Sequence, residues 1–194
     1  TTSIKIISIT GKLIKNIPNT TGYRYPAWSP NGNKFVCDDS ANIFVFDFDG
    51  NILDQTSIGT IEIPNWHPNG KYIIVADSNY IDELSSTNMN SLRQISTIGA
   101  DRFPSYSPCG NSIVYVYNAG NRIDTIDVDG TNLKTNLHAA TADRPCYFSR
   151  DGNYIYFIYT ASLDEIWRCD RDGNSSTRFA YDASNDFLYF RLKP

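Results

Sequence analysis

Short apolar runs, separated by polar turn residues, make up almost the whole chain. The runs are rich in Ile, Val, Tyr and Phe and are bounded by Gly, Asn, Asp or Pro, which is typical of β-strands. No stretch repeats apolar residues at a helical period over a useful length. We therefore predict a nearly all-β chain. The clearest runs are Lys34 to Cys37, Ile43 to Phe46, Tyr72 to Ala76, Ile113 to Tyr117, Ile123 to Val128 and Tyr154 to Tyr159.

A five-residue phrase, which begins with an aromatic residue and ends with glycine, recurs along this pattern. The copies read WSPNG, WHPNG, YSPCG and FSRDG, and their glycines at 32, 70, 110 and 152 are separated by 38, 40 and 42 residues. A repeat of this length is typical of propellers and related arrays. The aromatic residues that open the four copies are Trp28, Trp66, Tyr106 and Phe148.

A second motif, Asp-x-Asp-Gly, recurs out of phase with the first. Its clear copies end at Gly50, Gly130 and Gly173, and degenerate copies end at Gly11 and Asn90. We expect the first motif to turn strand A into strand B and the second to turn strand C into strand D, because Pro, Gly and Asp favour tight turns. Four short antiparallel strands in about forty residues form a propeller blade. In the third repeat the predicted strands are Arg102 to Tyr106, Ser112 to Tyr117, Asn121 to Asp127 and Thr131 to Leu137.

The repeats predict a five-bladed β-propeller of four-stranded antiparallel blades, formed by residues 1–194 as one domain. Strands Ile4 to Ile9 and Leu13 to Ile17 fit the C and D positions of a blade whose first half would come from the C-terminus. Pairing the terminal strands in one sheet would close the ring and remove exposed edges. The four complete blades are expected at about 24–57, 62–97, 102–138 and 143–179.

Two registers stay open for the C-terminal residues. In the first, Phe179 to Asp182 and Phe187 to Phe190 are strands A and B of the fifth blade. In the second, Thr177 to Tyr181 is strand D of the preceding blade, and Leu192 to Pro194 starts another phrase. The second register leaves only strand A at the end and favours a chain that is part of a longer propeller.

Together the motifs resemble the TolB-like propeller repeat, a relative of the WD repeat, whose units read Pro-x-Trp-Ser-Pro-Asp-Gly and then Asp-x-Asp-Gly. Pro26 to Gly32 with Asp47 to Gly50 matches best, and Pro64 to Gly70 and Pro104 to Gly110 follow. The resemblance covers essentially the whole chain. It implies a propeller fold and a role such as a protein-docking platform or a peptidase gate. Related propellers usually have six or more blades, and no peptidase domain accompanies this one.

Composition excludes several partners. A net charge of −4 gives no bulk attraction to nucleic acid or anionic membranes, and no apolar run of eighteen residues is present. We expect a monomer without a cofactor or metal. The compartment stays open, because no signal peptide is visible, the cysteines favour a reducing compartment and the resemblance favours a periplasmic one. The cysteines lack metal-type spacing and are predicted to be free and mostly buried: Cys37, Cys109, Cys146 and Cys169.

Charged residues stand one or two places before the strand A prolines, at one mouth of the predicted channel. Three guanidinium groups there would bind a carboxylate or phosphate of a protein or peptide partner. Alternatively, each arginine pairs with a neighbour such as Asp101 or Asp143. The phrase residues themselves are expected to build the blades. The predicted binding residues are Arg24, Glu62, Arg102 and Arg144.

The chain offers no clear catalytic constellation. A glycosidase needs a pair of carboxylates, and Glu62 is the one acidic candidate near a channel-facing strand start. His67 and His138 are expected at the surface, with no nucleophile elbow. The Asp-x-Asp-Gly corners lack the twelfth-position carboxylate of a calcium loop and are interpreted as turns.

We therefore predict a non-catalytic binding or scaffold propeller for a protein or peptide. The alternative is a carbohydrate-binding or glycoside-hydrolysing five-bladed propeller, with Tyr23, Tyr80 or Trp167 as non-periodic candidates for stacking on sugars. The periodic Trp28 and Trp66 are instead expected to pack between blades.

Overall fold

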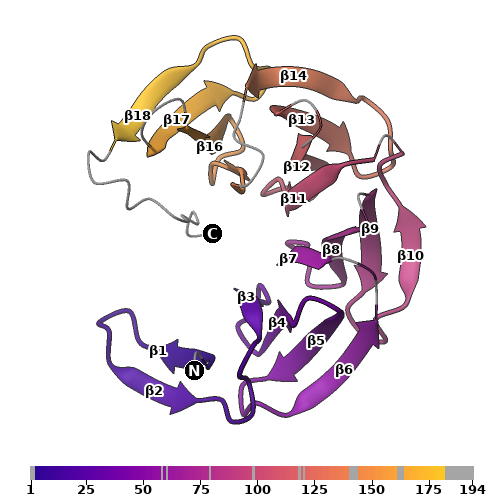
Figure 1. Cartoon of the computed structure of the whole chain (residues 1–194), viewed down its shortest axis with the longest axis vertical. Coiled ribbons are helices and arrows are strands. Elements are labelled where there is room, and N and C mark those ends of the chain that lie inside the picture. The colour runs from indigo at the N-terminus through magenta and orange to yellow at the C-terminus, as the bar shows by residue number, and fades with distance from the viewer. Residues whose placement is uncertain are drawn as a thin grey trace.

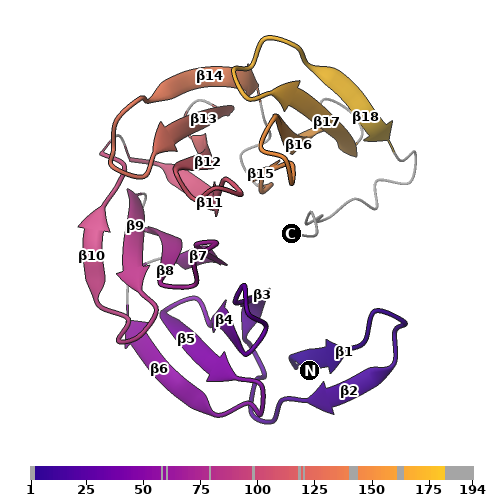
Figure 2. The ribbon, with the colours of Figure 1, turned by 180° about the vertical axis from the view of Figure 1, so that it is seen from behind.

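The computed structural model describes residues 3–57, 59, 61–78, 80–97, 99–117, 119, 121–139, 144–160 and 164–181. These residues form one two-stranded and four four-stranded antiparallel sheets, which follow one another in chain order around a central axis (Figure 1, and from behind in Figure 2). The all-β prediction and the four-stranded antiparallel blades are confirmed.

The N-terminal sheet consists of β1 (Lys5–Ile7) and β2 (Leu13–Asn16). The first blade consists of β3 (Arg24–Trp28), β4 (Lys34–Asp38), β5 (Asn42–Asp47) and β6 (Ile52–Ser57). The second consists of β7 (Ile61–Trp66), β8 (Tyr72–Asp77), β9 (Tyr80–Ser85) and β10 (Ser91–Gln94). The third consists of β11 (Asp101–Tyr106), β12 (Ser112–Tyr117), β13 (Arg122–Asp127) and β14 (Lys134–Ala139). The fourth consists of β15 (Tyr147–Phe148), β16 (Tyr154–Thr160), β17 (Asp164–Asp170) and β18 (Thr177–Tyr181).

The pairing of β18, the last strand among the described residues, distinguishes between the two registers. β18 pairs with β17, with Glu165 opposite Tyr181, so Thr177–Tyr181 is the outer strand of the fourth blade. The register that placed Phe179 to Asp182 in strand A of a fifth blade is therefore wrong. Phe187 to Phe190 and Leu192 to Pro194 lie outside the described residues. Within the described residues no sheet joins the two ends, since β1 pairs with β2 alone.

Both sequence motifs form the turns predicted for them. Gly32 has a φ of 71°, which a residue without Cβ adopts at low cost, and its N–H donates to the Ser29 carbonyl at 2.9 Å. In the other corner, Gly50 donates to the Asp47 carbonyl at 3.1 Å. The Asp47 carboxylate accepts a bond from the N–H of Asn51 at 2.8 Å, which supports the interpretation of this motif as a turn.

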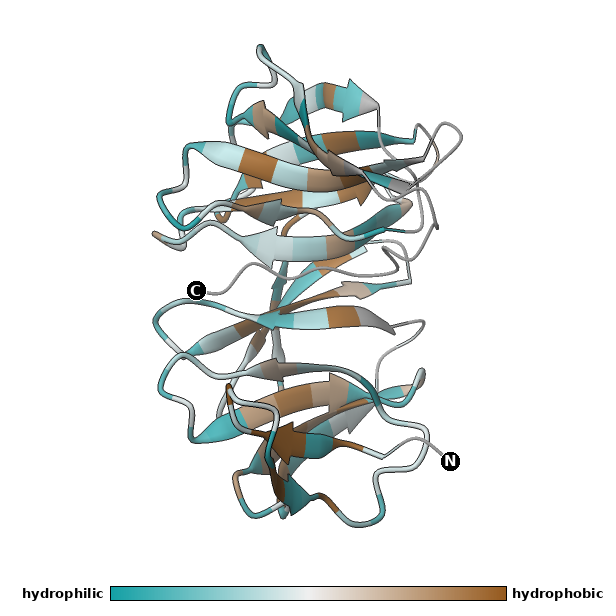
Figure 3. Cartoon of the chain, turned by 90° about the vertical axis from the view of Figure 1, so that its left-hand side faces the viewer, coloured by the Kyte–Doolittle hydropathy of each residue, from teal (hydrophilic) through white to brown (hydrophobic). Residues whose placement is uncertain are grey.

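The hydrophobic core lies between neighbouring sheets. One cluster holds Val36 and Val45 of the first blade with Trp66 and Leu84 of the second. Similar clusters join the N-terminal sheet to the first blade, the second to the third, and the third to the fourth. Figure 3 shows that hydrophobic residues concentrate in the strands, whereas many of the connecting corners are hydrophilic. Neighbouring sheets therefore bury their apolar faces against one another at each of these four boundaries.

The outer strand of one sheet also packs on the C-to-D corner of the next, a contact that we call the outer joint. A Cβ added to Gly173 would lie 2.8 Å from both Cα and the carbonyl oxygen of Leu137. At Gly50 it would lie 2.8 Å from Cγ2 of Ile17. An ion pair from Lys15 to Asp49, at 2.6 Å, lies at the edge of the same contact. At these two corners a side chain in place of glycine would occupy the space of the neighbouring sheet.

The inner strands of the first three blades share a bulge near their starts. The residue before the proline has a positive φ in each: 52° at Tyr25, 42° at Ile63 and 55° at Phe103. The strand register shifts at the same place in all three. Bulges redirect side chains, and these three residues, from three blades, belong to or pack against one apolar cluster. The bulge therefore gathers apolar side chains at the end of the channel where the inner strands begin.

Candidate functional site

The four predicted binding residues occupy one equivalent position, at the beginning of the inner strands. Arg24 lies in β3, Glu62 in β7 and Arg102 in β11, while Arg144 precedes β15 by three residues. All four positions therefore lie at the end of the central axis where the inner strands begin (Figure 1), which we call the arginine mouth. The side chain of Glu62 lies outside the described residues.

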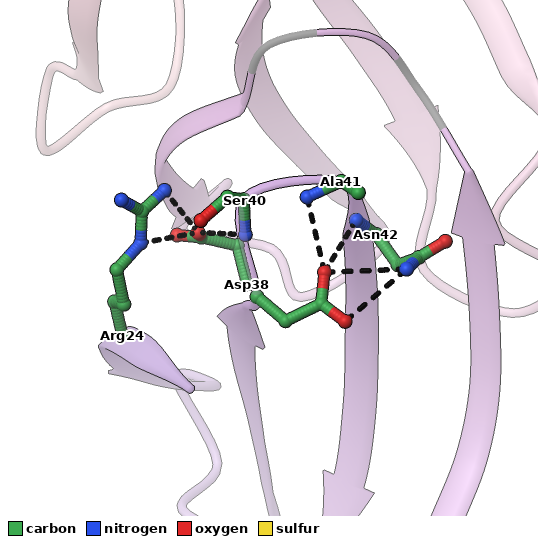
Figure 4. A network of polar contacts seen from close by, with 6 residues as sticks. Arg24, Asp38, Ser40, Ala41 and Asn42 are labelled. Atoms are coloured by element: carbon green, nitrogen blue, oxygen red, sulfur yellow. Dashed lines mark hydrogen bonds and ion pairs between the residues drawn. The ribbon is translucent and has the colours of Figure 1, made fainter. Parts of the chain in front are cut away.

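Arg24 is engaged by the buried carboxylate of Asp38 (Figure 4). Its Nε and Nη2 donate to Oδ1 of Asp38 at 3.0 and 2.8 Å, and the N–H of Ser40 donates to the same oxygen at 3.0 Å. Burial raises the pKa of Asp38, and the guanidinium opposes that rise. The alternative of local pairing is thus confirmed for Arg24, although its partner is on the neighbouring strand.

Of the two aspartates named as local partners, only Asp101 lies among the described residues. Asp101 is fully buried, and neither of its carboxylate oxygens has a hydrogen-bond partner, so it does not pair with Arg102. The guanidinium of Arg102 instead lies 5.3 Å from the centre of the Phe103 ring. Asp143 lies outside the described residues.

A cavity of about 440 Å³ lies at the opposite mouth, where the inner strands end. It is lined by the last residues of β3, β7, β11 and β15 and by the turns that follow them, so four blades contribute equivalent positions. Most of these lining residues belong to the repeated phrase, which was expected to build the blades. The aromatic wall consists of Trp28, Trp66, Tyr106 and Phe148.

The aromatic wall is buried except at Trp28. Trp66 is 6% exposed and donates from Nε1 to the Ala27 carbonyl of the first blade at 3.0 Å. Trp28 is 44% exposed and packs against Phe35 and Phe48 of its own blade. The prediction of packing between blades is confirmed for Trp66. For Trp28 the described contacts lie within its own blade, so the prediction stays open.

Most of the polar groups around the cavity are committed to the turns. The hydroxyl of Ser29 donates to the Asn31 side chain and the Lys34 carbonyl at 2.8 and 2.9 Å. The hydroxyl of Ser149 donates to Asp151 at 2.5 Å. Arg150 differs, because it is exposed and occupies the turn position that holds proline in the three preceding blades: Pro30, Pro68 and Pro108.

The histidines are half-buried between blades rather than at the surface as predicted. His67 packs on the Tyr106 ring at 4.6 Å, and its Nε2 lies 3.1 Å from the Gly110 carbonyl. Burial lowers the pKa of His67. His138 lies 4.6 Å from the Phe157 ring. Both imidazoles therefore serve as packing groups at blade boundaries.

Three further groups of candidates are the cysteines, the aromatic residues proposed to stack on sugars, and possible metal ligands. Three of the four cysteines are buried and all are free thiols, as predicted, with Cys109 exposed. Of the proposed sugar-stacking residues, Tyr80 is 38% exposed, whereas Tyr23 packs edge-on against Phe44 and Trp167 donates to Glu165. No three metal-binding side chains gather within the described residues. The described part also has no helix long and apolar enough to span a membrane.

Solved structures show which fold this is. The chain superposes on a putative TolB from Agrobacterium tumefaciens with a TM-score of 0.78 and 22% identity, covering 93% of this chain and 70% of that one. TolB from Acinetobacter baumannii gives 0.75 and 17%, covering 92% and 49%. A chain of a nidogen/laminin complex gives 0.70 and 12%, covering 91% and 73%. No protein-family model and no curated protein matches the sequence. The chain thus spans about half the length of the Acinetobacter TolB.

Proposed function

We propose that this chain, which has the fold of the TolB-like β-propellers, is a non-catalytic binding module that holds a peptide segment of a partner protein. The observation that carries the proposal is the cavity of about 440 Å³ at the end of the inner strands. Its volume lies within the range of ligand pockets, which combine apolar walls with a few polar groups.

The walls of the cavity suit a side chain or two of a peptide. Trp28 offers an exposed indole, and the turn prolines add rigid apolar rings that lose no rotamer freedom on binding. Asn65 and Ser105 contribute polar side chains between the aromatic residues. One structural neighbour is a propeller of a nidogen/laminin complex, which supports a protein rather than a small molecule as the ligand.

A peptide selection against the immobilised chain, followed by fluorescence polarisation, tests the proposal. Trp28→Ala removes the exposed indole from the cavity wall. It is expected to lower the affinity for a selected peptide by about tenfold, since truncating a central aromatic contact often costs more than 1 kcal/mol. Tyr80→Ala is the matched control, because Tyr80 is also partly exposed but does not line the cavity. Equal losses in both variants, or no selected peptide, would contradict the proposal.

The arginine mouth remains a prediction for a second contact with the same partner. Arg24 keeps 41% of its side chain exposed despite its pair with Asp38. Arg102→Ala combined with Arg144→Ala would reduce binding of the whole partner but not of the isolated peptide. Unchanged binding of the whole partner would remove the arginine mouth from the site.

A carbohydrate ligand is the second candidate, and the exposed indole of Trp28 is the observation that favours it. The described residues that line the cavity include no Asp or Glu, so the geometry favours binding over hydrolysis. A glycan array separates the two candidates. A sugar bound by the native chain and lost in Trp28→Ala would replace the peptide proposal.

We also propose that the ring holds five blades and exists as a monomer, with residues 182–194 completing the N-terminal sheet. Ile4, Ile6 and Ile17 pack with Phe35 and Phe46 of the first blade, which is how a blade contacts its neighbour. The inner edge of β1 has no strand partner among the described residues. A strand added there would satisfy its backbone groups.

A further inference from the structure

We infer that Arg150 makes this cavity selective for a segment that places a carboxylate beside an apolar side chain. The inference rests on the proposed peptide-binding function and assigns its ligand chemistry. It begins from a difference between the four copies of the repeated phrase, in which only the fourth has a charged residue where the others have proline.

Arg150 is the single charged side chain among the described residues that line the cavity. It is exposed, and within the described part of the chain it forms no hydrogen bond or ion pair. Other arginines are committed, for example Arg93 to Glu83 at 3.0 Å and Arg122 to Asp124 at 2.9 Å. The neighbouring Asp151 is occupied by the Ser149 hydroxyl and by the side chain and N–H of Asn153, all of them turn groups.

An uncommitted guanidinium at an apolar wall has a defined preference. It presents a planar fork of donors that matches the two oxygens of a carboxylate. Aromatic and prolyl rings on the remaining walls exclude water when a ligand enters, which strengthens the attraction. Because the rest of the lining is uncharged, nothing on the described walls repels an anion. An apolar or aromatic residue next to Asp, Glu or a free C-terminus fits this arrangement.

The equivalent turns of the other three blades indicate a control variant for Arg150. Arg150→Pro restores the residue found in the three equivalent turns, where proline is already compatible with the fold. Arg150→Gln is a second variant that keeps length and polarity without charge. Both variants remove the charge of residue 150 while keeping the turn. Circular dichroism verifies the fold of each.

The test measures fluorescence polarisation of one selected peptide in four forms: native, with its acidic residue replaced by the amide, with an amidated C-terminus, and with both changes. The native chain is expected to bind the form that lacks the critical carboxylate about tenfold more weakly, as charge-assisted bonds typically require. In both Arg150 variants this ratio falls to about one. Whichever single amidation causes the loss identifies a side-chain or a C-terminal carboxylate.

The outcomes distinguish the inference from the function on which it rests. Peptides that bind in a Trp28-dependent manner, but equally well as acid and amide, would overturn the inference and leave the proposed function standing. The inference would also be overturned if Arg150→Pro and Arg150→Gln kept the same ratio of affinities for the acid and amide peptides as the native chain. Failure to select any peptide would remove both.

Discussion

Arg24 directs two hydrogen bonds at one oxygen of Asp38, while the other oxygen, Oδ2, is buried without a partner in the described residues. The pair ties the start of β3 to the end of β4. It therefore stabilises the bulged inner strand as well as providing charge at the arginine mouth. The two partners differ in exposure: the side chain of Asp38 is fully buried, whereas that of Arg24 is 41% exposed.

Arg24→Ala is expected to lower the free energy of unfolding by about 2 kcal/mol, because it leaves the Asp38 carboxylate buried and unpaired. Adding Asp38→Asn should recover part of this loss, since the amide carries no charge. Urea denaturation measures both. Lys15→Ala, which removes the exposed pair with Asp49, should have a much smaller effect. A double variant less stable than Arg24→Ala alone would contradict this account.

We expect the buried carboxyl of Asp101 to make the free energy of unfolding depend on pH. Burial raises the pKa of this carboxyl to about 6; the charge of Asp124 adds to the rise, while the charge of Arg122 opposes it. Its contribution to stability is therefore present below about pH 4, where the unfolded carboxyl also binds its proton, and is lost as the pH rises through about 6. Relative to Asp101→Asn, the native chain should lose about 2–3 kcal/mol between pH 4 and 7.5. A difference that stays constant with pH, measured by denaturation at each pH, would show that this carboxyl does not titrate as proposed.

The outer joint can be tested with two glycines of similar backbone conformation. Gly173 and Gly32 have φ values of 79° and 71°, but a Cβ would meet the backbone of Leu137 at 2.8 Å only in the first case. Alanine at Gly32 should cost about 1 kcal/mol for the positive φ. Alanine at Gly173 should cost a further 1–3 kcal/mol, approximately, for overpacking. Thermal denaturation compares the two, and equal losses would mean that the joint adjusts freely.

Trp66→Phe tests the hydrogen bond that crosses from the second blade to the first. Loss of the indole N–H leaves the Ala27 carbonyl without this bond and should cost about 1 kcal/mol, with a further loss for the smaller ring. Trp28→Phe is the matched control, because Trp28 is 44% exposed and its described ring contacts lie within its own blade. Similar losses in chemical denaturation would argue against a special role for the Trp66 bond.

Deletion of residues 182–194 tests the proposed completion of the N-terminal sheet. If these residues pair with β1, the truncated chain should melt at a lower temperature and associate as its concentration rises, because an edge strand is exposed. Analytical ultracentrifugation and calorimetry measure the two effects. Phe190→Asp in the full chain is the milder companion variant. A truncated chain that melts like the full one, and remains monomeric, would exclude the proposed pairing.

Local turn chemistry explains how much of this fold was predictable. Strand β12 begins and ends where the sequence placed it, at Ser112 and Tyr117, because the turn-forming Pro108 and Gly110 precede it and Gly120 follows it. The apolar pattern of Phe179 to Tyr181 fits strand A or strand D equally well, so only the pairing with β17 could decide the register.

The site was less predictable because it depends on contacts between blades. A positive φ at Ile63, a β-branched residue before proline, has no signal in the sequence. Trp28 and Trp66 open the same phrase, yet Trp28 is 44% exposed and Trp66 only 6%. Arg150 did carry a signal, since it breaks the run of prolines at its turn position. Differences among repeat copies identify such residues, whereas their similarities identify the scaffold.

The outer joint bears on how propellers of this kind change size. Its two halves lie about one repeat apart: the outer strand of one unit supplies Ile17 or Leu137, and the corner of the next supplies Gly50 or Gly173. Duplication or loss of a unit whose corner carries this glycine would bring an outer strand and a corner of the same kind together at the new boundary. The number of blades could therefore change in steps of one unit without a new kind of interface.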